Sequence, residues 1–211
     1  MARSIALANE PHFPDVAQDL RGWFCRAIAP DSACSVLEVG DAHVGNWFAN
    51  VTRSEGALSS EARAGSVSFD IVVIHQSLGG CTTLQSALTS ARRLLRQGGW
   101  LVLSGANRLR PLSRSDWPSI PMPRATGWGF RSALKRAGFA DISLHVAHPP
   151  DSAPLYVIES HPRSARAFFG ARLAARGLPT WSPKRLLLGA LVATNVMPYL
   201  QPGFIVVGRR C

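Results

Sequence analysis

Two short stretches of this 211-residue chain hold side chains whose types and spacing could support chemistry. In the first, Glu38 precedes Gly40 at the end of a β-rich run. In the second, His75 and Gln76 directly follow an almost continuous apolar run. A glycine turn lets the backbone approach a ligand closely, because no Cβ stands in the way. A histidine at the end of a strand can act as a general base that takes a proton from a hydroxyl or an amine.

Each stretch also has a plainer interpretation. His75 and Gln76 could pack or form hydrogen bonds at the rim of a site, and we favour that role for His75 over proton transfer. Asp41 and His43 lie in the polar turn after Gly40. They either line a ligand site or belong to an ordinary surface loop, and the sequence favours neither.

Three further residues have chemical side chains for which we expect structural roles. Asp70 begins the second apolar run, and we expect it to orient backbone amides rather than to do chemistry. Trp117 and Trp128 could flank a substrate, although we expect Trp128 to pack in the core. No cysteine pair has CxxC spacing and no His/Cys cluster has the spacing of a zinc site, so no metal site is predicted.

Buried strands must position these residues. Residues 35–39, 69–74 and 100–104 are short apolar runs, typical of strands that are buried on both faces of a parallel sheet. Residues 82–97 form an amphipathic pattern that ends at two glycines, just before the third strand. Strand, helix and strand with tight glycine joints indicate a βαβ unit, so we expect the three strands to be neighbours in a mainly parallel sheet.

The rest of the chain is assigned by the same periodicities. We expect helices at 12–29, 128–137, 160–176 and 183–200, strands at 141–147 and 204–208, a helical turn at 46–51, and loops at 52–66 and 105–126. The length and the 46% apolar composition suit a single domain, 1–211, with a helical insertion at about 151–201.

Charge is distributed unevenly along a chain whose formal net charge is +10. Residues 1–91 carry a net charge of −4 and residues 92–211 a net charge of +14. A basic half could face nucleic acid, anionic lipid or a phosphorylated substrate. We expect no nucleic-acid partner, because no nucleic-acid motif accompanies the arginines. No run reaches the roughly 20 apolar residues that span a bilayer, and the N-terminus lacks the apolar run of a signal peptide, so we expect a cytoplasmic protein.

Five stretches occur in an order and spacing that resemble one family. They are VLEVGDAHVGN at 36–46, SVSFDIVVIHQSL at 66–78, LTSARRLLRQGGWLVLS at 88–104, FRSALKRAGFADISLHV at 130–146 and PGFIVVGRR at 202–210. They are similar to the glycine-rich first motif, the fourth strand, the helix–Gly-Gly–strand unit, the next helix–strand unit and the last strand of class I S-adenosylmethionine-dependent methyltransferases, of the type 11 kind.

The resemblance implies a Rossmann-like α/β fold with a mainly parallel sheet, helices on both faces, an antiparallel last strand and a helical insertion before it. It implies S-adenosylmethionine as cofactor, bound at the carboxyl ends of the strands, and a biosynthetic transfer of its methyl group. Carried onto this sequence, the cofactor contacts fall on Glu38, Gly40, Asp41, Ala42, His43, Gly45, Asp70 and Gln76. His75 is the candidate catalytic base, although many methyl transfers need no strong base, because positioning and the sulfonium charge supply much of the drive.

The cofactor region is shortened and partly degenerate compared with the family. Ala42 stands at the second glycine of the motif and Val44 at the third. Residues 46–68 are too few for the helix, strand, helix and strand that the family holds there, so we expect at least one strand–helix pair to be missing. The second strand of the family ends in an acid that binds the ribose hydroxyls. Here only Glu55 and Glu61 are candidates, and neither follows a convincing strand.

The helices expected at 160–176 and 183–200 differ in character. The first carries four arginines and the second is apolar on most sides. We expect the pair to cover the carboxyl ends of the strands as a lid on the acceptor pocket, with peripheral membrane contact as the alternative. The sequence thus predicts a methyltransferase that acts on a small-molecule or lipid-linked acceptor. The alternative is a catalytically degenerate binding or scaffold protein, peripheral to a membrane.

Overall fold

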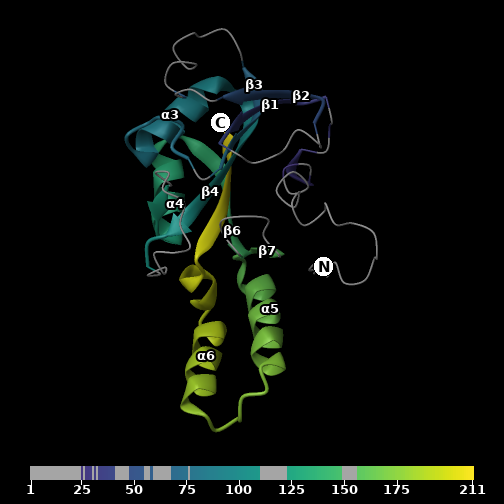
Figure 1. Cartoon of the computed structure of the whole chain (residues 1–211), viewed down its shortest axis with the longest axis vertical. Helices are drawn as coiled ribbons and strands as arrows, with labels where there is room; N and C mark the ends of the chain where they lie inside the picture. Colours follow the sequence, from purple (N-terminus) through teal and green to yellow (C-terminus); the bar gives the residue numbers. More distant parts are fainter. Residues whose placement is uncertain are drawn as a thin grey trace.

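A single sheet organises the protein (Figure 1). The computed structural model describes residues 25, 27–29, 31, 33–40, 48–54, 58, 68–75, 77–109, 123–148 and 156–211. In that part of the chain the strands are β1 (Ser35–Val39), β2 (Asn50–Ser54), β3 (Phe69–Ile74), β4 (Leu95–Asn107), β5 (Arg124–Ala125), β6 (Phe139–His148), β7 (Tyr156–Glu159) and β8 (Gly203–Arg210). The helical elements are α3 (Leu84–Leu94), α4 (Gly127–Arg136), α5 (Pro162–Ala175), α6 (Pro183–Ala193) and the 3-10 turn η3 (Met197–Leu200).

The strand order is β2-β1-β3-β4-β8-β6-β7, and β5 pairs with β4. Strands β2, β1, β3 and β4 run parallel, whereas β8 is antiparallel to β4 and β6. The predicted adjacency of 35–39, 69–74 and 100–104 is confirmed, because these residues lie in β1, β3 and β4. The predicted fold class is confirmed as well, including the antiparallel last strand.

Side chains alternate between two apolar clusters, one on each face of the sheet. In β3, Val72 and Ile74 belong to the larger cluster, whereas Ile71 and Val73 belong to the smaller one. This alternation follows from the two-residue period of a strand. Helices α3 and α4 cover the larger cluster, and Cys25, which is helical, lies in the smaller one. Because both faces of the sheet are covered, the central strands have continuous runs of apolar residues.

The segment between β1 and β3 corrects the sequence interpretation. Residues 46–51 were expected to form a helical turn and 52–66 a loop, but Asn50–Ser54 forms β2, parallel to β1. The sequence NVTRS shows no apolar run because only Ser54 of this strand is buried. A strand that pairs on one edge only and has an exposed face does not need an apolar run. Among the described residues, no strand lies beyond β2, which forms that edge of the sheet.

Several element boundaries also differ from expectation. The helix expected at 82–97 ends at Leu94, and β4 begins at once and continues to Asn107. Strands β5 and β7 were not predicted, since each is short and lies at an edge of the sheet. The helix expected at 183–200 stops at Ala193, because Asn195 adopts a left-handed conformation with φ of 57°. The remainder of that segment forms η3.

Helices α5 and α6 pack side by side and project beyond the sheet (Figure 1). We call α5, α6 and the turn between them, residues 162–193, the helical hairpin. Its base is anchored in the larger core, where Ala165 and Phe169 are buried and Val192 packs against them. The hairpin leads into β8, whose first residue, Gly203, pairs with Ala106 near the carboxyl end of β4. It therefore lies at the expected end of the sheet, but it extends away from the ends of β1 and β3 instead of covering them (Figure 1).

Candidate functional site

The candidate site lies where β1 and β3 end side by side. Val39 and Ile74 are paired in register, so Gly40 and His75 follow at the same edge of the sheet. The His75 amide donates a hydrogen bond to the Val39 carbonyl at 2.8 Å, which continues the pairing one residue past the strand. Strand β2 lies on one side of β1 and β3 lies on the other, so the order of the strands reverses at this point. Ligands of open α/β sheets bind at such a reversal, beyond the carboxyl ends of the strands.

Gly40 is required by its surroundings as well as by its backbone conformation. Its φ of +83° lies in the left-handed region that side chains disfavour. A Cβ on this residue would also lie 2.1 Å from the His75 carbonyl oxygen. The two strand ends can approach this closely only with glycine at position 40. The sequence indicated a glycine that makes room for a ligand, and the structure adds that it makes room for β3.

His75 is 3% exposed and is therefore buried at this edge. A general base must reach the proton that it removes, so this burial favours the packing and hydrogen-bonding role over proton transfer.

Glu38 is buried in β1, and its carboxylate pairs with Arg53 of β2. The distance from Arg53 Nε to Glu38 Oε2 is 3.5 Å, and the two residues are register partners. Arg53 is exposed, so the buried negative charge has a partner that reaches it from the surface. No local pattern indicated Arg53, because its relation to Glu38 depends on the pairing of β2 with β1.

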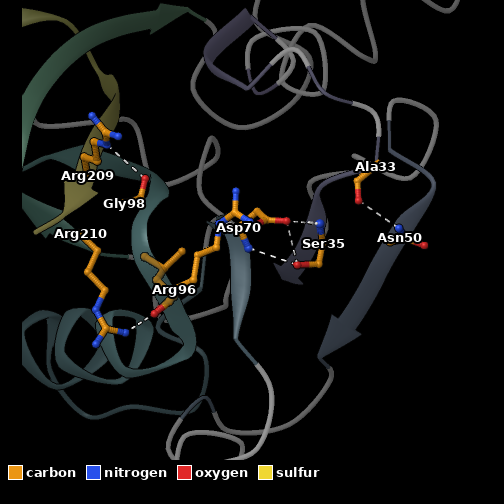
Figure 2. A network of polar contacts seen from close by, with 9 residues as sticks. Ala33, Ser35, Asn50, Asp70, Arg96, Gly98, Arg209 and Arg210 are labelled. Carbon is orange, nitrogen blue, oxygen red and sulfur yellow. Dashed lines mark hydrogen bonds and ion pairs between the residues drawn. The ribbon is translucent and has the colours of Figure 1, made fainter.

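Asp70 does not join the other predicted cofactor residues. It lies at the amino end of β3, whereas Gly40 and His75 lie at the carboxyl edge. One of its oxygens, Oδ2, accepts hydrogen bonds from the Ser35 amide at 2.7 Å and from the Ser35 hydroxyl at 3.1 Å. The other, Oδ1, pairs with Arg96 (Figure 2). Asp70 therefore fixes the start of β1 against β3, which agrees with its expected role of orienting a backbone amide.

Part of the predicted site lies outside the described residues. This holds for the rest of the glycine turn and the residue after His75, namely Asp41, Ala42, His43, Gly45 and Gln76. It holds also for Glu55, Glu61 and Trp117.

The segment between β1 and β3 contributes to the floor of the site. Leu58 is fully buried, and its amide donates a hydrogen bond to the Gly79 carbonyl at 2.8 Å. A Cβ on Gly79 would lie 2.5 Å from the Leu58 side chain and 3.0 Å from Val39. Leu58 thus packs under the loop that follows β3, beside the end of β1. Although short, the segment supplies both β2 and this apolar contact.

A second polar cluster lies at the end of β4. Asn107 is buried, and its side-chain amide donates hydrogen bonds to the Tyr199 and Gln201 carbonyls at 2.5 and 2.8 Å. Its Oδ1 accepts a hydrogen bond from the Leu109 amide at 3.0 Å. Asn107 therefore ties η3 to the sheet. Sequence reasoning missed it, because the two carbonyls that it binds lie more than 90 residues away.

Trp128 lies in the same region and corrects an expectation. It is 55% exposed rather than packed in the core. Its indole stacks on the Tyr199 ring, with centroids 4.3 Å apart and an interplanar angle of 6°. The contact joins the start of α4 to η3, so Trp128 lies at the surface beside the carboxyl end of β4.

A cavity of about 290 Å³ lies apart from the strand ends, between α5, α6 and η3. Most of its lining is apolar, from residues such as Phe169, Leu188 and Leu191, and it also includes Arg172 and Arg176. Of the predicted cofactor residues that the structure describes, none lines this cavity, so we assign it no part in cofactor binding.

Comparisons with known proteins agree with this geometry. Residues 16–103 match the family model of the methyltransferase domain. Comparison with curated protein sequences gives no match. Among solved structures, Haemonchus contortus phosphoethanolamine N-methyltransferase 2 in complex with S-adenosyl-L-methionine is 12% identical, with a TM-score of 0.51, over 90% of this chain and 52% of that chain.

Two further structures are similar over most of both chains. A possible histamine N-methyltransferase from Thermotoga maritima is 12% identical, with a TM-score of 0.48, over 92% of this chain and 88% of that chain. A methyltransferase from Archaeoglobus fulgidus is 12% identical, with a TM-score of 0.47, over 92% and 94%. At these identities the likeness concerns the fold and does not extend to substrates. The match at residues 16–103 and the strand order are consistent with the fold of class I S-adenosylmethionine-dependent methyltransferases.

Proposed function

We propose that this protein is a methyltransferase that binds S-adenosylmethionine at the carboxyl ends of β1 and β3. The observation that carries the proposal is the approach of Gly40 to His75 at the reversal of strand order, within the residues that match the methyltransferase domain. The acceptor is a small molecule or a lipid-linked molecule. We propose a cytoplasmic location for the protein.

The residues present fit this cofactor. Gly40 keeps the backbone clear at the end of β1, and the turn that follows it supplies Asp41 and His43 for the polar methionine end. Glu55 directly follows β2 in sequence, which is the position of the ribose-binding acid after the second strand of the family. We propose Glu55 as the acceptor of hydrogen bonds from the ribose hydroxyls. The bound cofactor supplies a methyl group on a positively charged sulfur, which is already activated toward a nucleophile.

We propose that the chain acts mainly by positioning. A buried His75 holds the ends of β1 and β3 together and does not remove a proton. Bringing the acceptor atom in line with the methyl group supplies much of the rate, because it replaces an encounter in solution with a prepared geometry. Trp128, which is exposed at the end of β4, offers a flat apolar face to such an acceptor.

A second candidate function is a scaffold that has lost catalysis. Ala42 and Val44 favour it, since both stand where the family has glycine. Such a protein would keep the fold and bind partners or a membrane surface, without binding the cofactor.

Calorimetry with S-adenosylhomocysteine separates the two functions. The methyltransferase binds this product, and the scaffold does not. Gly40→Val should abolish binding, because the added side chain meets the His75 carbonyl. Gly177→Val is the matched control, since Gly177 also has a positive φ, of +62°, but nothing lies within 4 Å of an added Cβ.

A second variant tests the ribose contact. Glu55→Gln should weaken binding of S-adenosylhomocysteine by about ten- to a hundredfold, the cost of replacing charged hydrogen bonds by weaker ones. If the unsubstituted chain shows no heat of binding while its fold is intact by circular dichroism, the methyltransferase proposal is wrong and the scaffold remains.

A further inference from the structure

The far end of the helical hairpin has an apolar surface that the rest of the described chain does not cover. We call residues 176–187, which include the turn and the start of α6, the hairpin tip. Trp181 is 78% exposed, and Leu186 and Leu187 are 62% and 63% exposed. No residue of α6 is buried, although the helix is rich in leucine. Exposed apolar side chains that gather in one place mark a surface that another phase or molecule covers.

The geometry of α6 explains this exposure. Leu188, Leu191 and Val192 line the cavity that faces α5. Successive residues of a helix are 100° apart around its axis, so Leu186 lies on the side opposite these three residues. Leu187 lies between the two sides. The sequence LLLGALV therefore supplies one face for packing inside the hairpin and a second face that is directed outward.

The same hairpin is strongly basic. Residues 160–200 hold six basic residues and no acidic residue: Arg163, Arg166, Arg172, Arg176, Lys184 and Arg185. Arg185 donates a hydrogen bond to the Leu178 carbonyl at 2.6 Å and so holds the turn against α6. The amino end of α6 also lies at the tip, and its dipole adds a partial positive charge there.

We propose that the helical hairpin docks on an anionic phospholipid membrane, with Trp181, Leu186 and Leu187 inserted among the headgroups. Tryptophan prefers the boundary between headgroups and acyl chains, and the leucines gain from burial in the apolar layer beneath. The arginines and Lys184 remain beside the phosphates, where each cation adds attraction. Among the described residues, no helix is long and apolar enough to cross a bilayer, so the contact is one of surface docking.

Charge complementarity selects a membrane over the other candidate occupants. A second copy of the chain that paired symmetrically through this surface would bring the same cations face to face, with no acidic residue of 160–200 between them. Nucleic acid would satisfy the cations but would leave Trp181 and the two leucines without a partner. An anionic bilayer satisfies both the charge and the apolar tip.

Vesicle binding by the full chain, without S-adenosylmethionine, tests the proposal. The chain should co-sediment with vesicles of phosphatidylcholine and phosphatidylglycerol and much less with phosphatidylcholine alone. Arg176→Ser with Lys184→Ser should weaken binding by about twenty-five-fold, because each surface cation contributes about a factor of five. Lys135→Ser with Arg136→Ser removes the same charge from exposed residues at the end of α4 and should have little effect.

The apolar part of the tip is tested in the same way. Leu186→Ser with Leu187→Ser should weaken vesicle binding by about tenfold or more. Leu109→Ser, which changes an exposed leucine in the turn after β4, should not weaken it. The tryptophan fluorescence should shift to shorter wavelength on vesicle binding, and Trp181→Phe should remove that shift.

Three results would overturn the proposal. One is equal binding by the tip variants and their controls. Another is retention on nucleic acid but not on anionic vesicles. The third is a dimer in sedimentation that the leucine changes dissolve, which would identify a second copy as the occupant. None of these readouts involves the cofactor, so failure here leaves the methyltransferase proposal intact, and the reverse also holds.

Discussion

Gly40 and Asp70 lie at opposite ends of neighbouring strands, and this separation divides the predicted site residues into two groups. Residues at the carboxyl edge, such as Gly40 and His75, remain candidates for the cofactor site. Asp70, at the amino end of β3, joins Ser35 and Arg96 in a structural network (Figure 2). Both groups carry chemically active side chains, so only their position along the strands distinguishes their roles.

Asp70→Ala should lower the free energy of unfolding by about 1–3 kcal/mol, because the Ser35 amide loses its acceptor. Affinity for S-adenosylhomocysteine should not change. Urea unfolding and calorimetry on the same variant measure the two quantities. Glu159→Ala, at an exposed position in β7, is the control and should leave both unchanged. A large loss of affinity in a stable Asp70→Ala variant would return Asp70 to the cofactor site.

His145 should make stability depend on pH. Burial lowers the pKa of His145 from 6.5 to about 4, while Nε2 and the Ser143 hydroxyl lie 2.9 Å apart in a hydrogen bond. Between these pKa values the unfolded chain binds the proton more tightly than the folded chain. The free energy of unfolding therefore falls as pH decreases from about 6.5 to about 4, by up to about 3 kcal/mol from this residue.

The variant His145→Gln keeps a hydrogen-bonding side chain but cannot titrate. Its unfolding free energy should fall less steeply with decreasing pH across that window. Urea unfolding of both proteins at several pH values gives the two slopes. Equal slopes would show that His145 is protonated as readily in the folded chain as in the unfolded chain.

At the scale of elements, Asn107 determines how η3 meets the sheet. Asn107→Ala removes two donated hydrogen bonds and one accepted hydrogen bond at a buried position. We expect a loss of about 2–4 kcal/mol in the free energy of unfolding, and faster amide exchange in η3 and the start of β8. Asn50→Ala is the matched control, because exposed Asn50 makes a side-chain hydrogen bond to the Ala33 carbonyl at 3.1 Å. Similar losses in the two variants would contradict this role.

The last strand is held at its other end by two arginines. Arg209 donates a hydrogen bond to the Gly98 carbonyl at 3.2 Å, and Arg210 donates one to the Leu95 carbonyl (Figure 2). Asn107 holds the segment that enters β8, and these arginines hold the residues that leave it. The hairpin between β7 and β8 can therefore project without loosening the sheet, because β8 is fixed at both ends.

At the scale of the whole molecule, the two halves of the chain contribute different charge. The half with net charge −4 supplies β1, β2, β3 and the candidate cofactor site. The half with net charge +14 supplies the hairpin, which projects away from β1, β2 and β3 in Figure 1.

The sequence by itself determined the central part of the fold. The runs at 35–39, 69–74 and 100–104 are apolar because both faces of their strands are buried, and glycines mark the joints between them. Such local patterns survive in the sequence whatever the rest of the chain does. The sequence also indicated Gly40 and His75 as neighbours at a site, because parallel strands end at the same edge.

Only the tertiary structure decided the remaining features. Strand β2 has no apolar run, so its pairing with β1 was needed to reveal it and to bring Arg53 to Glu38. Asp70 and Asn107 act on backbone groups distant in sequence, which no local spacing predicts. The sequence showed that α6 is apolar on most sides, but it did not show that Leu186 and Leu187 are exposed. An apolar residue is the same whether protein, lipid or solvent surrounds it, and only the folded chain shows which of these it meets.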